Sequence, residues 1–151
     1  MEVFRISAST YSTQLTSSGA ANRWNAANEF VIYTGSSRSL STLELIVHRN
    51  SIRPNETYKV MVISIADEDT LITQVLTKNL PSNWRSALAY PQLNLIGSNW
   101  YSLQQSLILQ VPSAVIINEY NYIINTTHPD FTKKVKLVRT ENYFWDNRLI
   151  S

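Results

Sequence analysis

The chain has 151 residues, a length that a single hydrophobic core serves, so we expect one domain spanning residues 1–151. Its composition, with 44% hydrophobic and 16% charged residues, is that of a globular protein, and a net charge of +2 is too small to indicate nucleic-acid binding by itself. The absence of cysteine excludes disulfides and cysteine-based zinc sites, and without a long apolar run or a secretory signal we expect a cytoplasmic protein.

The first half of the chain predicts three strands, one loop and one helix. Residues Val3–Ile6, Phe30–Tyr33 and Tyr58–Ile65 are rich in β-branched and aromatic side chains, which is typical of strands. The polar, Ser- and Asn-rich residues 16–28 predict a loop. Residues Ser39–Arg49 predict a helix, because apolar side chains recur there every three to four residues.

The second half predicts a long helix among short strands. The stretch from Trp84 to Gln105 indicates a helix, with Pro91 suited to its first turn. Strands are expected at Leu71–Leu76, as a neighbour of Tyr58–Ile65, and then at Leu107–Val111, Ala114–Ile117, Tyr122–Ile124 and around Val135 and Leu137. Because strands outnumber helices and do not alternate regularly with them, the pattern favours an α+β fold over a doubly wound parallel sheet.

Glycine is scarce, with Gly19, Gly35 and Gly97 as its three positions. A glycine-rich phosphate loop of the P-loop or dinucleotide-binding type cannot be built from these positions. If the protein binds phosphates, side chains must therefore provide much of the binding.

Two candidate ligand-binding residues lie in the first third of the chain. Arg23, inside the polar loop, is able to hold a phosphate or carboxylate through two parallel hydrogen bonds, although an arginine stacked on Trp24 or exposed to solvent is the commoner case. Tyr33, at the end of a strand, is able to stack on a flat ring and offer its hydroxyl. Its alternative is an ordinary aromatic residue of the core or its rim.

Glu44 lies on the apolar stripe that Leu40, Leu43 and Val47 form along the predicted helix. A carboxylate on a core-facing stripe is costly unless it is paired or functional. A second interpretation is a capping box from Ser41 to Glu44, in which the carboxylate reaches back to the start of the helix. The local sequence leaves both interpretations open.

Ser113 follows Pro112, which interrupts two apolar segments, so its hydroxyl is able to point into a cleft. Without a G-x-S-x-G elbow or a nearby histidine, a role as hydrolase nucleophile has little support, and a serine that turns the backbone is the alternative. His48 follows Glu44 by one helical turn without a second histidine, so we expect a structural or exposed histidine and no metal site.

Taken in order, these motifs resemble the RES domain family, which is named for its arginine, glutamate and serine. The resemblance runs from Phe4 to Leu149, almost the whole chain. One departure is that Ala21-Asn22 precede the arginine where the family usually has glycines, although asparagine tolerates left-handed backbone well. The segments that carry the resemblance are Arg23-Trp24-Asn25, Val31–Thr34, Leu43–His48, Gly97 with Trp100, Val111–Val115, Asn121–Asn125, His128–Phe131 and Asp146–Leu149.

The resemblance implies a compact domain with a mixed, mostly antiparallel sheet, similar to ADP-ribosyltransferases. It implies the toxin of a bacterial toxin–antitoxin pair that depletes NAD⁺ by cleaving the nicotinamide–ribose bond, as a phosphorylase, a glycohydrolase or an ADP-ribosyltransferase. NAD⁺ would be the substrate, with no cofactor. The implied partner is an Xre-type helix-turn-helix antitoxin in an oligomeric assembly, in which this chain makes no direct DNA contact.

The resemblance also suggests roles for four residues. Glu44 would stabilise the positive charge that builds on the ribose as the bond breaks. Arg23 would hold the pyrophosphate or position its ribose, and Tyr33 would stack on the nicotinamide ring. Ser113 would hydrogen-bond the ribose or the amide. The alternative function is a catalytically silent RES-like module that binds an acidic protein or RNA.

Overall fold

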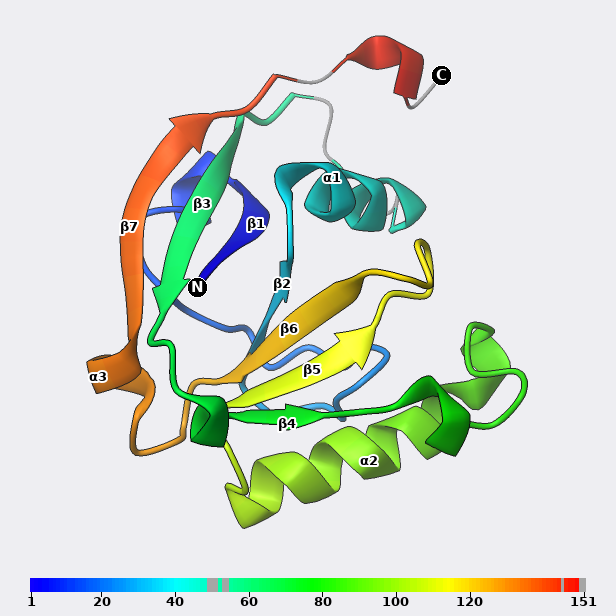
Figure 1. The fold of residues 1–151 in the computed structure, drawn as a ribbon. Coiled ribbons are helices and arrows are strands. Elements are labelled where there is room, and N and C mark those ends of the chain that lie inside the picture. Colours follow the sequence, from blue (N-terminus) through cyan, green and yellow to red (C-terminus); the bar gives the residue numbers. More distant parts are fainter. Residues whose placement is uncertain (49–51, 53–54, 145, 150–151) are drawn as a thin grey trace.

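In a computed structural model that describes residues 1–48, 52, 55–144 and 146–149, seven strands form one sheet (Figure 1). Their order is β4-β5-β6-β2-β1-β3-β7, and every neighbouring pair is antiparallel except β4 and β5. The expected α+β fold with a mixed, mostly antiparallel sheet is therefore confirmed. The strands are β1 (Glu2–Ala8), β2 (Val31–Gly35), β3 (Tyr58–Ile65), β4 (Ile72–Gln74), β5 (Ile108–Pro112), β6 (Tyr120–Asn125) and β7 (Val135–Asn142).

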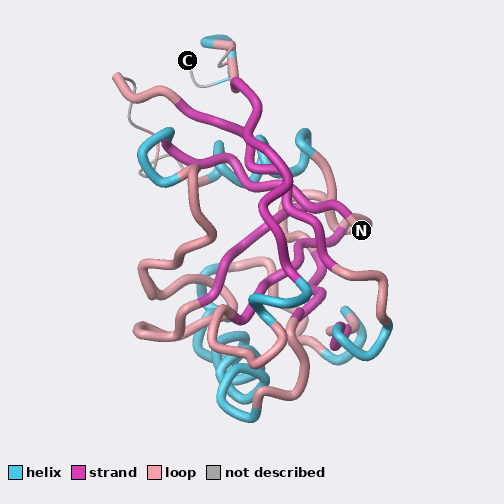
Figure 2. The backbone as a smooth tube through the Cα atoms, turned by 90° about the vertical axis from the view of Figure 1, so that its left-hand side faces the viewer, coloured by secondary structure: helices cyan, strands magenta, loops and turns pink. Residues whose placement is uncertain are grey.

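Helices and short 3₁₀ turns connect these strands. Figure 2, turned by 90° from Figure 1, shows the longest helix at one end of the molecule and the strands passing through its middle. Within the described residues, no helix is long and apolar enough to cross a membrane. The helices are α1 (Arg38–Val47), α2 (Tyr90–Leu103) and α3 (Phe131–Lys134), and the 3₁₀ turns are Ser9–Tyr11, Asp69–Leu71, Thr77–Asn79, Ala87–Ala89 and Asn147–Leu149.

The sheet opens into two parts where β1 meets β2. Strand β1 pairs with β3 along its whole length, whereas β1 and β2 share one partner pair, Phe4 with Gly35. In Figure 1 the two parts diverge from this junction, and α1 packs against both β1 and β2. A Cβ at Gly35 would lie 2.6 Å from Oγ of Ser41, so glycine permits the close approach of α1. Residues from both parts of the sheet therefore meet beside α1.

The opposite end of the sheet is covered by α2, which also holds the polar loop in place. A Cβ at Gly97 would lie 1.6 Å from the backbone oxygen of Trp24, so only glycine allows this contact. Nδ2 of Asn94 donates to the carbonyl oxygens of Asn22 and Arg23, both at 2.8 Å. The core beneath α2 contains Trp24, Val31, Trp84, Ala89, Leu93, Trp100, Leu109, Val111 and Ile123.

Helix α1 starts before the predicted capping box. Its N-cap is Ser37, whose Oγ accepts from the amide nitrogen of Leu40 at 3.0 Å. Ser41 lies inside the helix, and its hydroxyl donates to the carbonyl oxygen of Phe4 at 2.9 Å. The capping-box interpretation is therefore wrong, because an earlier serine already caps the helix. The predicted end at Arg49 lies outside the described residues.

The predicted apolar stripe of α1 is also wrong in part. Leu40 is buried, but Leu43 is 36% exposed and Val47 is 56% exposed. The helix instead directs Ser41 and Leu45 toward the strands, because it rests on the β1–β2 junction at one edge. The spacing of leucine and valine along α1 therefore did not predict which face of the helix is buried.

Two other predicted elements differ from the structure. Residues Leu71–Leu76 contain β4, but β4 pairs with β5 in parallel, and the neighbours of β3 are β1 and β7. The helix predicted from Trp84 begins at Tyr90, with Pro91 in its first turn as expected. Strand pairing depends on contacts that are distant in sequence, so the local pattern could not give it.

Residues 114–117 form bends and a turn instead of the predicted strand. Oγ of Ser113 accepts hydrogen bonds from the amide nitrogens of Val115, at 3.1 Å, and Ile116, at 3.0 Å. These bonds turn the backbone immediately after β5, which overrides the β-propensity of the apolar side chains.

Candidate functional site

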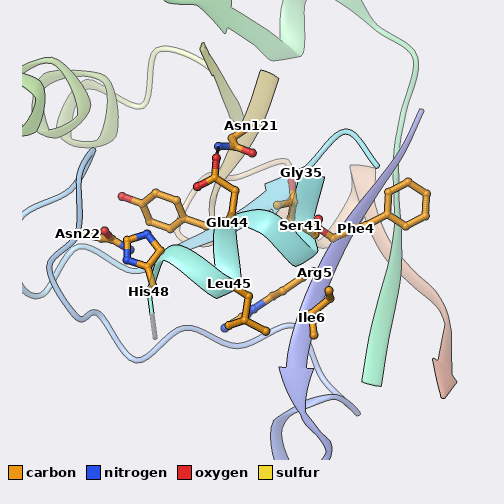
Figure 3. Close-up of a pocket in the computed structure, with 12 residues that line it drawn as sticks. Phe4, Arg5, Ile6, Asn22, Gly35, Ser41, Glu44, Leu45, His48 and Asn121 are labelled. Carbon is orange, nitrogen blue, oxygen red and sulfur yellow. Dashed lines mark hydrogen bonds between the residues drawn. The ribbon is translucent and has the colours of Figure 1, made fainter. Parts of the chain in front are cut away.

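A cavity of about 210 Å³ opens beside α1 at the junction of the two parts of the sheet (Figure 3). Its lining includes one acidic residue, Glu44, and one arginine, Arg5. Among the described residues, no three histidine or acidic side chains gather to hold a metal ion. The lining residues are Phe4, Arg5, Ile6, Asn22, Tyr33, Thr34, Gly35, Ser41, Glu44, Leu45, His48 and Asn121.

The carboxylate of Glu44 is held by one of its two oxygens. Oγ of Ser113 donates to Oε1 at 2.6 Å, and Nδ2 of Asn121 donates to the same oxygen at 2.8 Å. In the described part of the chain, Oε2 receives no hydrogen bond and the carboxylate forms no ion pair. A carboxylate fixed in this way is able to accept a hydrogen bond from a ligand hydroxyl and to stabilise a nearby positive charge.

Ser113 is fully buried behind this carboxylate. Its hydroxyl donates to Glu44 and accepts from the amides of Val115 and Ile116. A hydroxyl has one donor and two acceptor positions, and the protein engages all three. The structure therefore confirms the turn-forming interpretation, whereas the hydroxyl has no position left for the expected hydrogen bond to a ligand and reaches the site through Glu44.

Tyr33 contributes its ring to the cavity wall, while its hydroxyl points into the protein. The hydroxyl accepts from the amide nitrogen of Trp24 at 3.0 Å and donates to Oδ1 of Asn25 at 2.6 Å. Burial raises the pKa of Tyr33 well above its usual value, so the phenol stays neutral. The ring face is available to a ligand, whereas the hydroxyl is used to fix the loop.

Arg23 lies outside the cavity lining. Its Nη1 donates to the carbonyl oxygen of Trp84 at 2.9 Å, and its guanidinium lies 4.8 Å from the ring centre of Tyr90. Its neighbour Asn22 does line the cavity. The structure thus brings Glu44, Ser113 and Tyr33 together and places the Arg23 guanidinium against other partners.

The departure from the family's glycines does not strain the loop. Left-handed backbone in this region occurs at Gly19 and Asn28 and not at Ala21 or Asn22. The side chain of Asn22 instead accepts a hydrogen bond from the amide nitrogen of Arg23 at 2.8 Å. Residues other than glycine are therefore accommodated before the arginine.

Three polar residues of the cavity were not assigned a ligand role from the sequence. Arg5 comes from β1, donates to the carbonyl oxygen of Thr16 at 3.2 Å, and has its pKa lowered by burial. Asn121 comes from β6, and His48 is the C-cap of α1. For His48, the spacing of one helical turn from Glu44 could have indicated that it lies in the same cavity. For Arg5 and Asn121 the signal lies in strand pairing, which a single sequence does not contain.

Comparisons with known proteins agree with this geometry. The RES domain family matches residues 2–146 of the chain. A Sphingobium protein named Prs ADP-ribosylating toxin is 34% identical over 129 residues, which is 85% of this chain and 80% of that protein. A Yersinia enterocolitica protein named Toxin Res is 32% identical over 127 residues, which is 84% of this chain and 82% of that protein.

A solved structure shares the fold at low sequence identity. It is the crystal structure of the Mycobacterium tuberculosis MbcT–MbcA toxin–antitoxin complex, and the matching chain gives a TM-score of 0.72 at 16% identity. The match covers 94% of this chain and 83% of that chain. The similarity therefore extends over the whole arrangement of strands and helices.

Proposed function

The chain belongs to the RES domain family, and on this premise we propose that it is the toxin of a bacterial toxin–antitoxin pair and cleaves the nicotinamide–ribose bond of NAD⁺. The observation that carries the proposal is the carboxylate of Glu44 in the wall of the cavity, which is fixed through Oε1 and receives no hydrogen bond at Oε2 from the described residues. The toxin names of the relatives support the same conclusion.

The reaction needs what this carboxylate supplies. When the bond between C1′ of the ribose and the pyridinium nitrogen breaks, its electron pair leaves with nicotinamide, which becomes neutral. Positive charge then develops on the ribose, as in other glycosidic cleavages. Oε2 of Glu44 accepts a hydrogen bond from a ribose hydroxyl and stabilises this charge, and the interaction strengthens as the charge grows.

The other groups of the cavity fit the remaining parts of NAD⁺. The ring face of Tyr33 stacks on nicotinamide, and Arg5 pairs with the pyrophosphate. A volume of about 210 Å³ is below the roughly 300–1,000 Å³ of pockets that enclose drug-sized ligands, so the cavity holds the nicotinamide riboside part. The rest of the dinucleotide extends past Asn22.

The acceptor of the ADP-ribosyl group is phosphate, water or a protein side chain. Each of these adds at C1′ after nicotinamide has left, and a protein acceptor would agree with the name of the Sphingobium relative. We further propose that the partner is an Xre-type antitoxin in a cytoplasmic, oligomeric complex. The solved structure that shares the fold belongs to a toxin–antitoxin complex, which supports an antitoxin as partner.

The test is nicotinamide release by the purified protein from NAD⁺, with and without phosphate, and phosphorus NMR of the products. Glu44→Gln keeps the shape of the side chain and removes its charge. It should lower kcat by about a hundredfold to a thousandfold and leave Tm nearly unchanged. A folded wild-type protein that releases no nicotinamide, or a Glu44→Gln variant with full activity, contradicts the proposal. RNA binding that weakens with salt, without turnover, would favour the silent binding module.

A further inference from the structure

We infer that Asn121 is a positioning residue for Glu44, and that it acts with Ser113 to present Oε2 of the carboxylate to the ribose. The inference rests on the proposed function and adds a residue for which the sequence analysis suggested no role. Both residues donate to the same oxygen, Oε1, from one side of the carboxylate. Figure 3 shows the amide of Asn121 directed at Glu44 across the cavity wall.

Three separate elements converge on this oxygen. Glu44 comes from α1, Ser113 follows the end of β5, and Asn121 lies in β6. Asn121 is paired in register with Gly35 of β2 on one side and with Val111 of β5 on the other. Strand pairing therefore fixes the position of the amide, and the amide in turn fixes the carboxylate of a side chain that otherwise has several rotamers.

The side chain of Asn121 has no evident structural purpose elsewhere. Among the described residues, Glu44 is the one hydrogen-bond partner of its amide nitrogen, and the backbone of β6 is held by both neighbouring strands without it. The pairing of β6 with its neighbours uses backbone atoms and does not need the contact between Asn121 and Glu44. Asn121 therefore acts on the carboxylate and not on the stability of the strand.

The neutrality of both donors matters for the reaction. A lysine or arginine at the same place would neutralise the carboxylate and weaken its attraction for the ribose cation. An amide and a hydroxyl orient the carboxylate and leave its negative charge in place. Replacing the amide by a second carboxylate would place like charges at hydrogen-bond distance and turn Glu44 away.

The first experiment measures kcat and KM for NAD⁺ in Asn121→Ala, Asn121→Asp and Ser113→Ala. Asn121→Ala should lower kcat by about tenfold to a hundredfold with little change in KM, because the carboxylate is misdirected and not removed. Asn121→Asp should lower kcat further. The matched control is Asn142→Ala, an exposed asparagine of β7 that contacts Lys59 and does not line the cavity, and it should have wild-type kinetics. An unchanged kcat in Asn121→Ala, or a change in KM alone, overturns the inference.

A second measurement does not need turnover. In protein labelled with ¹³C at the glutamate carboxyl groups, the resonance of Glu44 is assigned by its loss in Glu44→Gln. This resonance should shift in Asn121→Ala and stay in place in Asn142→Ala, because the hydrogen bond to Oε1 is lost in the first variant alone. If the wild-type protein does not cleave NAD⁺, the proposed function fails while this shift still tests the positioning. An unmoved resonance in Asn121→Ala overturns the inference by itself.

Discussion

The two sides of the cavity are built in different ways. On the α1 side, Glu44 is half-buried, and the described residues give it two neutral donors on one oxygen and none on the other. On the loop side, the polar groups of Trp24, Asn25 and Tyr33 are engaged with one another. Arg23 on that side is likewise held by Trp84 and Tyr90.

The difference separates residues that build the cavity from residues that are free to act in it. A group whose hydrogen bonds are all made within the protein stabilises the fold, and its loss costs stability first. A group with an unused acceptor in a cavity is available to a ligand, and its loss costs activity first. The loop side should therefore respond to mutation mainly in Tm, and the α1 side mainly in kcat.

The largest effect on the loop side is expected for Gly97→Ala. The added Cβ would meet the backbone oxygen of Trp24 at 1.6 Å, so α2 and the loop must move apart. We expect a loss of about 1–3 kcal/mol or failure to fold, measured by urea unfolding. Asn99→Ala, at an exposed position of α2, is the control and should lose less. A Gly97→Ala variant with wild-type stability would mean that the loop is not held as described.

The next prediction compares the effects of replacing Arg5 and Arg23. Arg5→Lys removes the planar guanidinium from the cavity and should raise KM for NAD⁺ by about tenfold, since charge-assisted pairing to phosphate is lost. Arg23→Lys removes the contacts with Trp84 and Tyr90 and should lower Tm more than Arg5→Lys does. Steady-state kinetics measure KM, and thermal unfolding measures Tm, for both variants. If Arg23→Lys raises KM at unchanged Tm, the division between the two sides is wrong.

A smaller effect is expected for Tyr33→Phe, which keeps the ring and removes the hydroxyl. The amide nitrogen of Trp24 and the side-chain oxygen Oδ1 of Asn25 then lose their partner, at a cost of about 1 kcal/mol. KM should stay near the wild-type value because the stacking face is retained. Tyr33→Leu, which removes the ring as well, should raise KM. Equal KM values for the two variants would show that the ring does not contact the substrate.

The smallest effect concerns Glu141, a carboxylate of β7 that pairs with Arg38 at the start of α1. Glu141 accepts hydrogen bonds from Arg38 at 2.8 Å and from Arg139 at 3.0 Å, and chiefly the bond from Arg38 lowers its pKa to about 2. A lowered carboxyl pKa stabilises the fold at pH values above the unfolded pKa, about 4.5, and this stabilisation is lost as pH falls through about 2.

The Tm difference between wild type and Glu141→Gln should therefore be present at pH 6, small because the pair is exposed, and should shrink between pH 4.5 and pH 2. Added salt should reduce it as well. A difference that grows on acidification would contradict the assignment of this ion pair.

The sequence by itself determined most strand positions, the place of α2 near Pro91, and the order of motifs that indicated the family. Tyr58–Ile65 was predicted with the bounds that β3 has. These features follow from propensities and periodicity over a few neighbouring residues.

Only the tertiary structure decided what surrounds Glu44. The donors Ser113 and Asn121 lie 69 and 77 residues from it along the chain, and Arg5 enters the cavity because β1 and β2 meet at a single pair. Such contacts depend on strand register and on the rotation of α1, and both are set by packing between distant segments. For the same reason the sequence analysis identified the acid of the cavity, but neither the amide that contacts it nor the arginine that lines the same cavity.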